Sequence, residues 1–422
     1  EGRDGPRGVV RAEHRSGSTD AAAAAAMEPP PIVPTGGMTT FNMQHGFTEA
    51  LVRGMRSGFL KDQDYHHLTQ CENLEDVKMN LQETDYDQFL SDVTTVTPSI
   101  IQQKATEKMV IEFQYMRAHS VEPLSSFMDF IAIEYMIENV MLLLKGTLSG
   151  RDVNELMEQC HPLGMFKEST MRLCTAFDNS PKGYSDLYQT VLVETPVGKY
   201  FSEILAQKSA MLENAGEVRN VLEEVEIEIL KNSLMKLYLE DFYYFCQEIG
   251  GETAPLMCEL LKAKSDQRAI NITLNSFGTP LNEPSMRDGD GWPTRKSLYP
   301  SIGFLYPEGT ELLVNVSDEQ TLGVAMEKIG GIYSSIWNTH VNEAISDKSI
   351  DDAFFEREVE MLELAFENQM HFACFYAYTK LKEQEIRNLV WISECIVQQQ
   401  KEEVNKFVPC FSASAPWRNR RP

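Results

Sequence analysis

Two aspartates and a glutamate between Ser349 and Glu356 have the spacing that comes closest to known chemistry. Asp351 and Asp352 are adjacent, and Glu356 follows on the same predicted helix. Paired carboxylates on a helix can hold magnesium ions against a diphosphate, as in all-α isoprenoid enzymes. The spacing to Glu356 is one residue too long for that motif, and no second metal motif follows. We favour a helix start, with Ser349 and Asp352 as a capping box and the acidic residues stabilised by the helix dipole. The magnesium enzyme is kept as an alternative.

Other reactive residue types lack partners at recognisable spacing. His371 and Cys374 lie one turn apart, but nothing nearby supplies the other two ligands that zinc needs. Cys160 and His161 fit a turn before Pro162, with no orienting base for a thiolate. The sequence has no GxxxxGK[ST], HExxH or GxSxG motif, and no GxGxxG follows a predicted strand. We therefore predict no catalytic residue, no metal site and no cofactor.

A group of charged residues interrupts an apolar helical segment near the C-terminus. Its members are Lys382, Glu383, Glu385, Arg387 and Glu394. Glu383 and Arg387 are four residues apart, in the order that favours a helical ion pair. The group could be a solvated face or hinge, or an internal polar network that fixes the register of the helix. Removing one partner of a buried pair costs about 3–5 kcal/mol.

Two charged residues elsewhere, Glu240 and Arg268, also occur in apolar surroundings. We predict that they join Glu385, Arg387 and Glu394 in a structural polar network in the interior of the protein.

The segment that must position this network is 332–408, which contains neither glycine nor proline, the strongest helix breakers. Apolar residues recur there at the spacing of one helical face: Phe355, Val359, Leu362, Phe366, Met370, Ala373 and Tyr376. A second apolar phase runs from Ile386 to Val397. Further helices are predicted over 47–60, 62–70, 72–90, 104–119, 217–249 and 254–264. Residues 269–274 alternate like a strand, but we favour a helix because nothing nearby offers a pairing partner.

The most membrane-like run is 127–144, which contains Asp129, Glu134 and Glu138. One central acidic residue opposes membrane insertion by about 2.5–3.5 kcal/mol. Three of them predict a buried helix of a soluble body with a narrow polar stripe.

Composition limits the classes of partner. Aspartate and glutamate total 63 against 38 lysine and arginine, a formal net charge of −25. Such a surface is repelled by nucleic acid and by anionic lipid. Any membrane contact is therefore expected to pass through a protein. Eight cysteines without a CxxC pair predict reduced thiols in the cytosol.

The predicted layout is a disordered extension over 1–37, one all-α domain over 38–411 and a C-terminal tail over 412–422. A weak internal echo relates Leu81-Gln-Glu-Thr84 to Leu192-Val-Glu-Thr195. It indicates a copied helical unit, and three copies are the expectation.

Several stretches closely resemble subunit d of the vacuolar-type proton-pumping ATPase, and the similarity extends from Phe41 to Phe411. The matching stretches include 46–54, 68–76, 160–164 (Cys-His-Pro-Leu-Gly), 226–232, 239–243, 266–272, 275–278, 305–309 (Leu-Tyr-Pro-Glu-Gly) and 382–396 (Lys-Glu-Gln-Glu-Ile-Arg-Asn-Leu-Val-Trp-Ile-Ser-Glu-Cys-Ile). The termini and the segments 206–222 and 283–296 depart from the family pattern.

The resemblance implies a funnel-like body of three related helical units with pseudo-threefold symmetry. It implies a non-catalytic rotor subunit that seats the central stalk, subunits D and F, on the proteolipid c-ring. ATP hydrolysis would thereby be coupled to proton translocation, next to subunit a of the membrane sector. The expected location is peripheral, on the cytosolic face of the vacuole, lysosome, endosome or Golgi, with the plasma membrane as a further site. The alternatives are the isoprenoid enzyme and a free helical scaffold.

Overall fold

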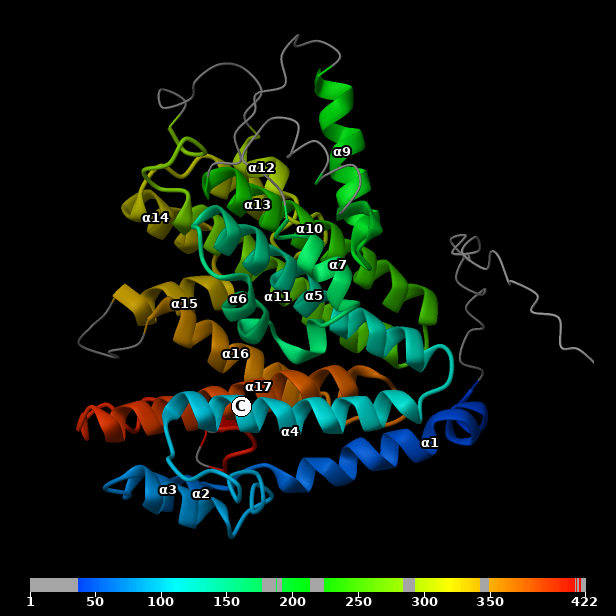
Figure 1. Ribbon diagram of the computed structural model, residues 1–422. Helices are drawn as coiled ribbons and strands as arrows, with labels where there is room; N and C mark the ends of the chain where they lie inside the picture. Colours follow the sequence, from blue (N-terminus) through cyan, green and yellow to red (C-terminus); the bar gives the residue numbers. More distant parts are fainter. Residues whose placement is uncertain are drawn as a thin grey trace, which may run out of the picture. The chain divides into compact units, whose positions relative to one another are not determined.

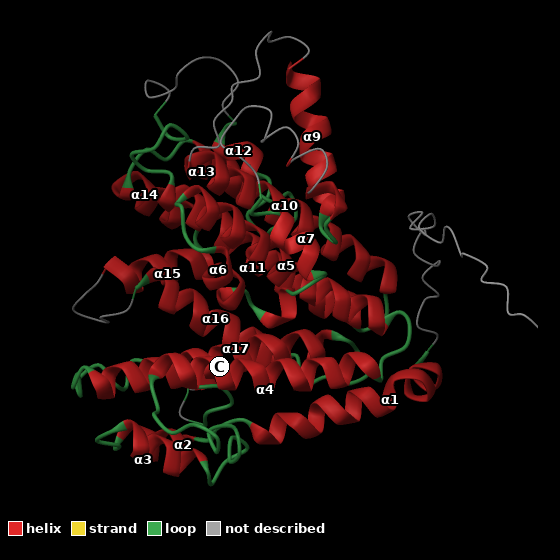
Figure 2. Cartoon of the chain, in the orientation of Figure 1, coloured by secondary structure: helices red, strands yellow, loops and turns green. Residues whose placement is uncertain are grey.

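Helices make up the regular secondary structure of the described residues, which contain no strand (Figure 2). The computed structural model describes residues 37–176, 187, 192–212, 224–283, 293–341, 349–413, 415 and 417–418. They belong to one compact unit, Val33–Pro422. The extension predicted over 1–37 lies outside them except for Gly37, as do residues 213–222 and 284–292 of the two departing segments. The predicted all-α class is confirmed for the described part.

The described residues form α-helices (α) and short 3-10 helices (η). In chain order they are α1 (Met38–Met55), η1 (Arg56–Gly58), α2 (Asp62–Thr69), α3 (Leu74–Leu81), α4 (Pro98–Ala118), α5 (Leu124–Leu148), α6 (Val153–Gln159), η2 (Pro162–Gly164), α7 (Glu168–Leu173), η4 (Leu192–Glu194), α9 (Gly198–Leu212), α10 (Glu224–Ile249), α11 (Thr253–Asn275), α12 (Arg295–Leu298), α13 (Glu308–Val314), α14 (Glu319–Ile329), α15 (Gly331–Val341), α16 (Ile350–Leu364) and α17 (Ala373–Val397).

Local signals in the sequence set several helix ends. The Thr97 side chain accepts a hydrogen bond from Ile100 N, and Pro98 occupies the first position of α4. The predicted capping box of Ser349 and Asp352 is confirmed at the start of α16. Gly330, with φ +76°, ends α14 in a conformation that side-chain-bearing residues rarely adopt.

Helix α5 contains the apolar run predicted to be a buried helix, and most of its side chains are buried. Glu134 is among them, on a helix whose buried side chains are mostly apolar. Among the residues that the structure describes, no helix has the length and apolarity needed to cross a membrane.

Helix α17 is the element around which the others pack. It contacts α1, α3, α4, α5, α11 and α16, and the α4 contact is the most extensive of these. Figure 1 shows α17 running along the cyan α4, with the blue α1 below both helices in this view; α1 contacts both of them. Helices from the N-terminal and C-terminal parts of the chain therefore pack against α17. Eighteen residues of α17 between Ala373 and Cys395 are buried.

The apolar stripe from Phe355 to Tyr376 is not one helix, and that prediction was wrong. Helix α16 ends at Leu364, α17 begins at Ala373, and Met370 between them has φ +63°. Two residues of α1 stabilise the non-helical backbone between α16 and α17 by hydrogen bonds. Arg53 donates to the carbonyls of Phe366 (2.9 Å) and Asn368, and Glu49 accepts from Met370 N at 2.9 Å.

The segment 269–274 is helical, as predicted, because it forms the last turns of α11. The two halves of the internal echo also have the same local geometry. The Thr84 hydroxyl donates to Leu81 O at 2.7 Å, and the Thr195 hydroxyl donates to Leu192 O at 2.7 Å. The segments 81–84 and 192–195 thus form the same kind of turn.

Close packing of η2 against α5 gives a first testable prediction. A Cβ atom at Gly164 would lie 2.3 Å from Tyr135 O and 2.6 Å from Asn139 Nδ2. Asn139 cannot move away freely, because it bonds both the N–H (2.7 Å) and the carbonyl (2.9 Å) of His161. Gly164→Ala is therefore expected to lower the free energy of unfolding by about 1–3 kcal/mol in urea titrations.

Gly54→Ala is the matched control, since nothing lies within 4 Å of its added Cβ atom on α1. Removing glycine from a helix is expected to stabilise it by up to about 1 kcal/mol. Equal effects of the two substitutions would contradict this account of the packing.

Candidate functional site

A fully buried ion pair on α17 connects three segments that are far apart in the sequence. The Nζ atom of Lys382 lies 2.9 Å from Glu385 Oε1, and the two side chains are 2% and 0% exposed. Glu385 also accepts hydrogen bonds from Leu60 N and from the Tyr86 hydroxyl, each at 2.6 Å. Lys382 lies over the Phe59 ring, 4.5 Å from its centroid. The carboxylate is therefore satisfied by donors from α17, the α1–α2 connection and the turns after α3.

A second buried pair joins α17 to α5. Lys380 Nζ lies 2.9 Å from Glu134 Oε2 and 3.0 Å from Glu383 Oε2. Burial alone would raise the pKa of Glu134, but the charges of Lys380 and Lys264 lower it to about 2. Burial opposes the charge of Lys380 as well, yet Glu134 and Glu383 raise its pKa well above the ordinary value. Both groups are therefore ionised, although both side chains are mostly buried.

A third set of contacts fixes the C-terminal segment. Asn388 on α17 donates to Val408 O at 2.7 Å and to the Tyr65 hydroxyl at 3.1 Å. Glu363 on α16 accepts from Phe411 N, Trp417 Nε1 and Arg418 Nη2. Of the tail predicted over 412–422, Ser412 and Trp417 are buried against the helical body.

The structure places the five predicted network residues in different surroundings. Glu385 is the buried acceptor described above. Arg268 donates to Asn232 Oδ1 at 3.2 Å, and Glu134 and Glu138 act to raise its pKa while burial lowers it overall. Glu240, on α10, accepts from Ser301 N at 2.7 Å.

The remaining two predicted residues, Arg387 and Glu394, do not contact Glu385. Arg387 is exposed, donates to Gln384 Oε1 at 2.6 Å and lies 4.1 Å from the Phe355 ring centroid. The ion pair expected between Glu383 and Arg387 is replaced by these contacts and by the pair with Lys380. Glu394 is half-buried and accepts from Gln398 at 3.2 Å. Arg387 therefore packs against α16, and Glu394 lies near the C-terminal end of α17.

Sequence reasoning did not include Glu134, Lys380 or Tyr86 in the network. The signal for Glu134 was present, since it is one of three acidic residues in the mostly apolar run 127–144. Nothing in the sequence indicated that Tyr86 would meet a residue 299 positions later.

A further carboxylate, Asp266 on α11, holds the loop before α13. It accepts from Phe304 N and Leu305 N, each at 3.0 Å, and from the Tyr333 hydroxyl. Burial raises the pKa of Asp266 to about 6, although its hydrogen bonds act in the opposite direction. A Cβ atom at Gly303 would lie 2.0 Å from Asp266 Oδ1, so the loop approaches as closely as glycine allows.

The residues considered for chemistry have structural partners. The Asp352 carboxylate accepts from the backbone and hydroxyl of Ser349. His371 and Cys374 are fully buried in the core. Burial raises the pKa of the Cys160 thiol to about 11, so it is protonated at neutral pH. His161 shapes its turn, as predicted, by accepting from Leu163 N at 3.2 Å.

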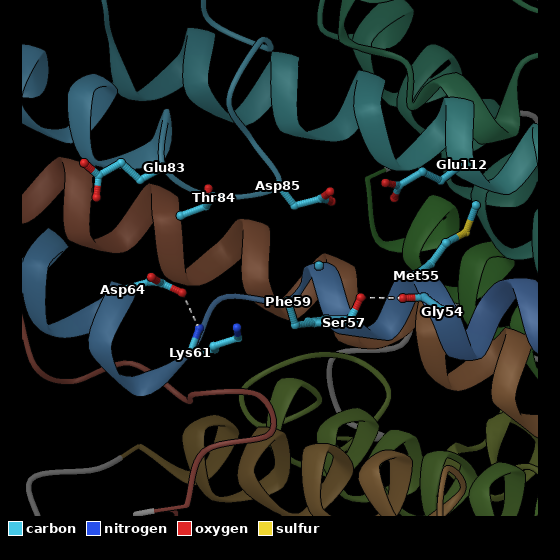
Figure 3. A pocket seen from close by; sticks show the side chains of 11 residues that line it. Gly54, Met55, Ser57, Phe59, Lys61, Asp64, Glu83, Thr84, Asp85 and Glu112 are labelled. Atoms are coloured by element: carbon cyan, nitrogen blue, oxygen red, sulfur yellow. Dashed lines mark hydrogen bonds between the residues drawn. The ribbon is translucent and has the colours of Figure 1, made fainter.

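A surface pocket of about 370 Å³ lies beside the Lys382–Glu385 pair, where α1 ends (Figure 3). Its acidic lining residues are Asp64, Glu83, Asp85 and Glu112. Three of these carboxylates are bound within the protein: Asp64 to Lys61 N (2.8 Å), Asp85 to Lys108 (2.9 Å), and Glu112 to Lys108 (2.6 Å). The pocket lining therefore belongs to the same structural polar system.

The buried ion pairs of α17 hold this helix in one register relative to its neighbours. Buried ion pairs have few alternative partners, so they specify one packing of α17 against its neighbours.

Comparison with known proteins agrees with the resemblance found in the sequence. Residues 48–407 match the family described as ATP synthase (C/AC39) subunit. The V-type proton ATPase subunit d of Dictyostelium discoideum is 44% identical over 377 residues, covering 89% of this chain and 98% of that protein. Subunit d1 of the same pump in Arabidopsis thaliana is 43% identical, covering 87% and 97%. Subunit d of Saccharomyces cerevisiae is 37% identical, covering 88% and 99%. The chain therefore belongs to the subunit d family of the V-type proton ATPase, a non-catalytic part of that pump.

Proposed function

We propose that the chain is a rotor subunit that seats the central stalk, subunits D and F, on the proteolipid c-ring. In this role it delivers the torque generated by ATP hydrolysis to the ring and so couples hydrolysis to proton translocation. Its membrane contact is made through the ring rather than through lipid, with subunit a as a neighbour. The location that follows is the cytosolic face of acidified endomembranes or of the plasma membrane.

The observation that best supports this role is the set of buried ion pairs on α17. A part that transmits torque must resist bending, and a close-packed helical body with fixed register does so. The Lys382–Glu385 pair holds the N-terminal segment at Leu60 against α17, and the Lys380–Glu134 pair holds α5 against the same helix. A permanent contact with the ring is expected to bury about 2,000–5,000 Å². The proposal includes related helical units around a pseudo-threefold axis, and the sequence feature that supports it is the recurrence of Leu-X-Glu-Thr at residues 81–84 and 192–195.

Membership in a non-catalytic family removes the isoprenoid enzyme as an alternative. The free scaffold is separated from the rotor subunit by co-purification. From detergent-solubilised membranes, the affinity-tagged full-length chain is expected to recover proteolipid and stalk subunits D and F together. An untagged chain is the control. Recovery of neither partner would contradict the coupling role.

A further inference from the structure

Two histidines are buried where α1 meets the break between α16 and α17. His45 on α1 and His371 in the break are both 0% exposed. Within the described part of the chain, neither ring nitrogen of His45 has a hydrogen-bond partner, and Nδ1 of His371 has none. Buried polar atoms without partners are uncommon, because nothing replaces the hydration that they lose on folding. We define the histidine joint by His45 together with His371 and Phe372 of the break.

Aromatic rings pack against His45. Its ring centroid lies 4.9 Å from that of Phe372, edge to face, and 5.3 Å from that of Phe41. Phe372 is held in place by its own N–H, which donates to Thr253 Oγ1 at the start of α11. The neutral imidazole therefore fits this site as a small aromatic ring, and its N–H group remains without an acceptor among the described residues.

His371 completes the joint from within the break. Its Nε2 atom lies 3.0 Å from Asn368 O, so the neutral ring with its proton on Nε2 donates there. The same carbonyl accepts from Arg53, which binds Glu49 at 2.8 Å. Burial lowers the pKa of His371, while Arg53 lowers it further and Glu49 acts to raise it. A second proton, on Nδ1, would find no acceptor among the described residues.

The other titratable groups that the surrounding elements bring to the joint are paired, exposed or uncharged. The Cys374 thiol of α17 is buried, which raises its pKa. The charged groups are Glu112 and Arg117 of α4, which bind Lys108 and Asp129, and the exposed Glu122 before α5, Glu252 before α11 and Glu367 in the break. Burial lowers the pKa of His45, because a charged imidazole would lose its hydration at this site.

We infer that the histidine joint is an acid-sensitive hinge, in which protonation of His45 and His371 is coupled to release of α1 from the break between α16 and α17. Burying an unpaired charge is unfavourable, so the protons are taken up in the opened form, where the rings reach water. Both pKa values in the closed joint are below the ordinary 6.5. The closed form is therefore fully stable above pH 6.5 and loses stability as the pH falls below it.

Opening of the joint would expose the start of α17, the helix around which the others pack. It would also separate Arg53 and Glu49 from the backbone of the break, to which they are hydrogen-bonded in the closed form. The hinge thus places a response to pH at the contact between the N-terminal helix and the central helix.

Hydrogen exchange of the full chain, followed by mass spectrometry, tests the inference. Uptake of one proton on opening raises the opening constant about tenfold between pH 7.5 and pH 5.5. After correction for the intrinsic effect of pH, the amides of 38–55 and 366–376 are expected to exchange at least tenfold faster at pH 5.5. The double variant His45→Leu, His371→Leu should lose this acceleration. His66→Leu is the matched control, because His66 is exposed on α2, and it should respond to pH like the original chain.

NMR titration of carbon-13-labelled histidine in the full chain gives a second measurement, which does not depend on the stability of the leucine variant. The resonances of His45 and His371, assigned by their loss in His45→Phe and His371→Phe, are expected to titrate with pKa values below 6.5. Ordinary titration of both rings would overturn the inference. So would equal exchange of the original chain at the two pH values, or an acceleration that persists unchanged in the double variant.

Discussion

Replacing Glu385 with alanine is expected to lower the free energy of unfolding by about 3–5 kcal/mol, because Lys382 would remain buried without its counter-charge. The Leu60 N–H and the Tyr86 hydroxyl would lose their acceptor at the same time. A buried polar group left without a partner adds about 1–3 kcal/mol to such a loss. Urea-induced unfolding, followed by circular dichroism at neutral pH, measures the change.

Glu394→Ala is the control for Glu385→Ala, since Glu394 is half-buried on the same helix and its carboxylate accepts a hydrogen bond from Gln398 at 3.2 Å. We expect a change within about 0.5 kcal/mol there. The double variant Lys382→Met, Glu385→Met leaves no buried charge at this site and should be more stable than Glu385→Ala alone. A double variant less stable than the single one would contradict the ion-pair explanation.

Glu134→Gln is expected to lower the free energy of unfolding by about 3 kcal/mol at pH 7. The pKa of Glu134 falls from 4.5 to about 2 in the folded protein, and each unit corresponds to about 1.4 kcal/mol. Because the folded-state pKa is depressed, this stabilisation is complete above pH 4.5 and disappears as the pH falls towards 2. The difference between the original chain and the variant should therefore shrink by about 2 kcal/mol between pH 7 and pH 3.

Glu138→Gln serves as the comparison, one turn further along α5. Glu138 is half exposed, and its contact with Lys231 spans 3.9 Å. Exposed pairs of this kind contribute about 0–1 kcal/mol. A difference between the original chain and Glu134→Gln that stays constant down to pH 3 would show that Glu134 is not held ionised by Lys380.

Local features of the fold were predictable from the sequence, because their causes lie within a few residues. The capping box at Ser349 and Asp352, the helix over 269–274 and the buried α5 are of this kind. Each follows from hydrogen bonding or apolar spacing along one helix. The resemblance to subunit d also followed from short stretches that could be compared directly.

The break between α16 and α17 was not predictable, because residues of α1 produce it. Residues 365–372 contain no glycine or proline and continue the apolar spacing. The backbone leaves the helix where Arg53 and Glu49 supply hydrogen bonds to it from more than 300 positions away. No local pattern contains that information.

Partners distant in the sequence also decide which charged residues of α17 are buried. Glu385 and Arg387 lie two residues apart on α17, so they point in different directions. Glu385 faces Tyr86 and Leu60, whereas Arg387 lies on Phe355 near the surface. The sequence shows a cluster of charges but not which face the neighbouring helices cover.

Rotation of this chain with the motor is the most direct test of the central claim that it passes torque to the ring. A bead can be attached through Val324→Cys on α14, with the half-buried Cys258 replaced by serine, in a pump held to a surface by its catalytic head. During ATP hydrolysis, the bead is predicted to turn with the same direction and rate as a bead on the central stalk. A bead that stays fixed while the stalk turns would contradict the account.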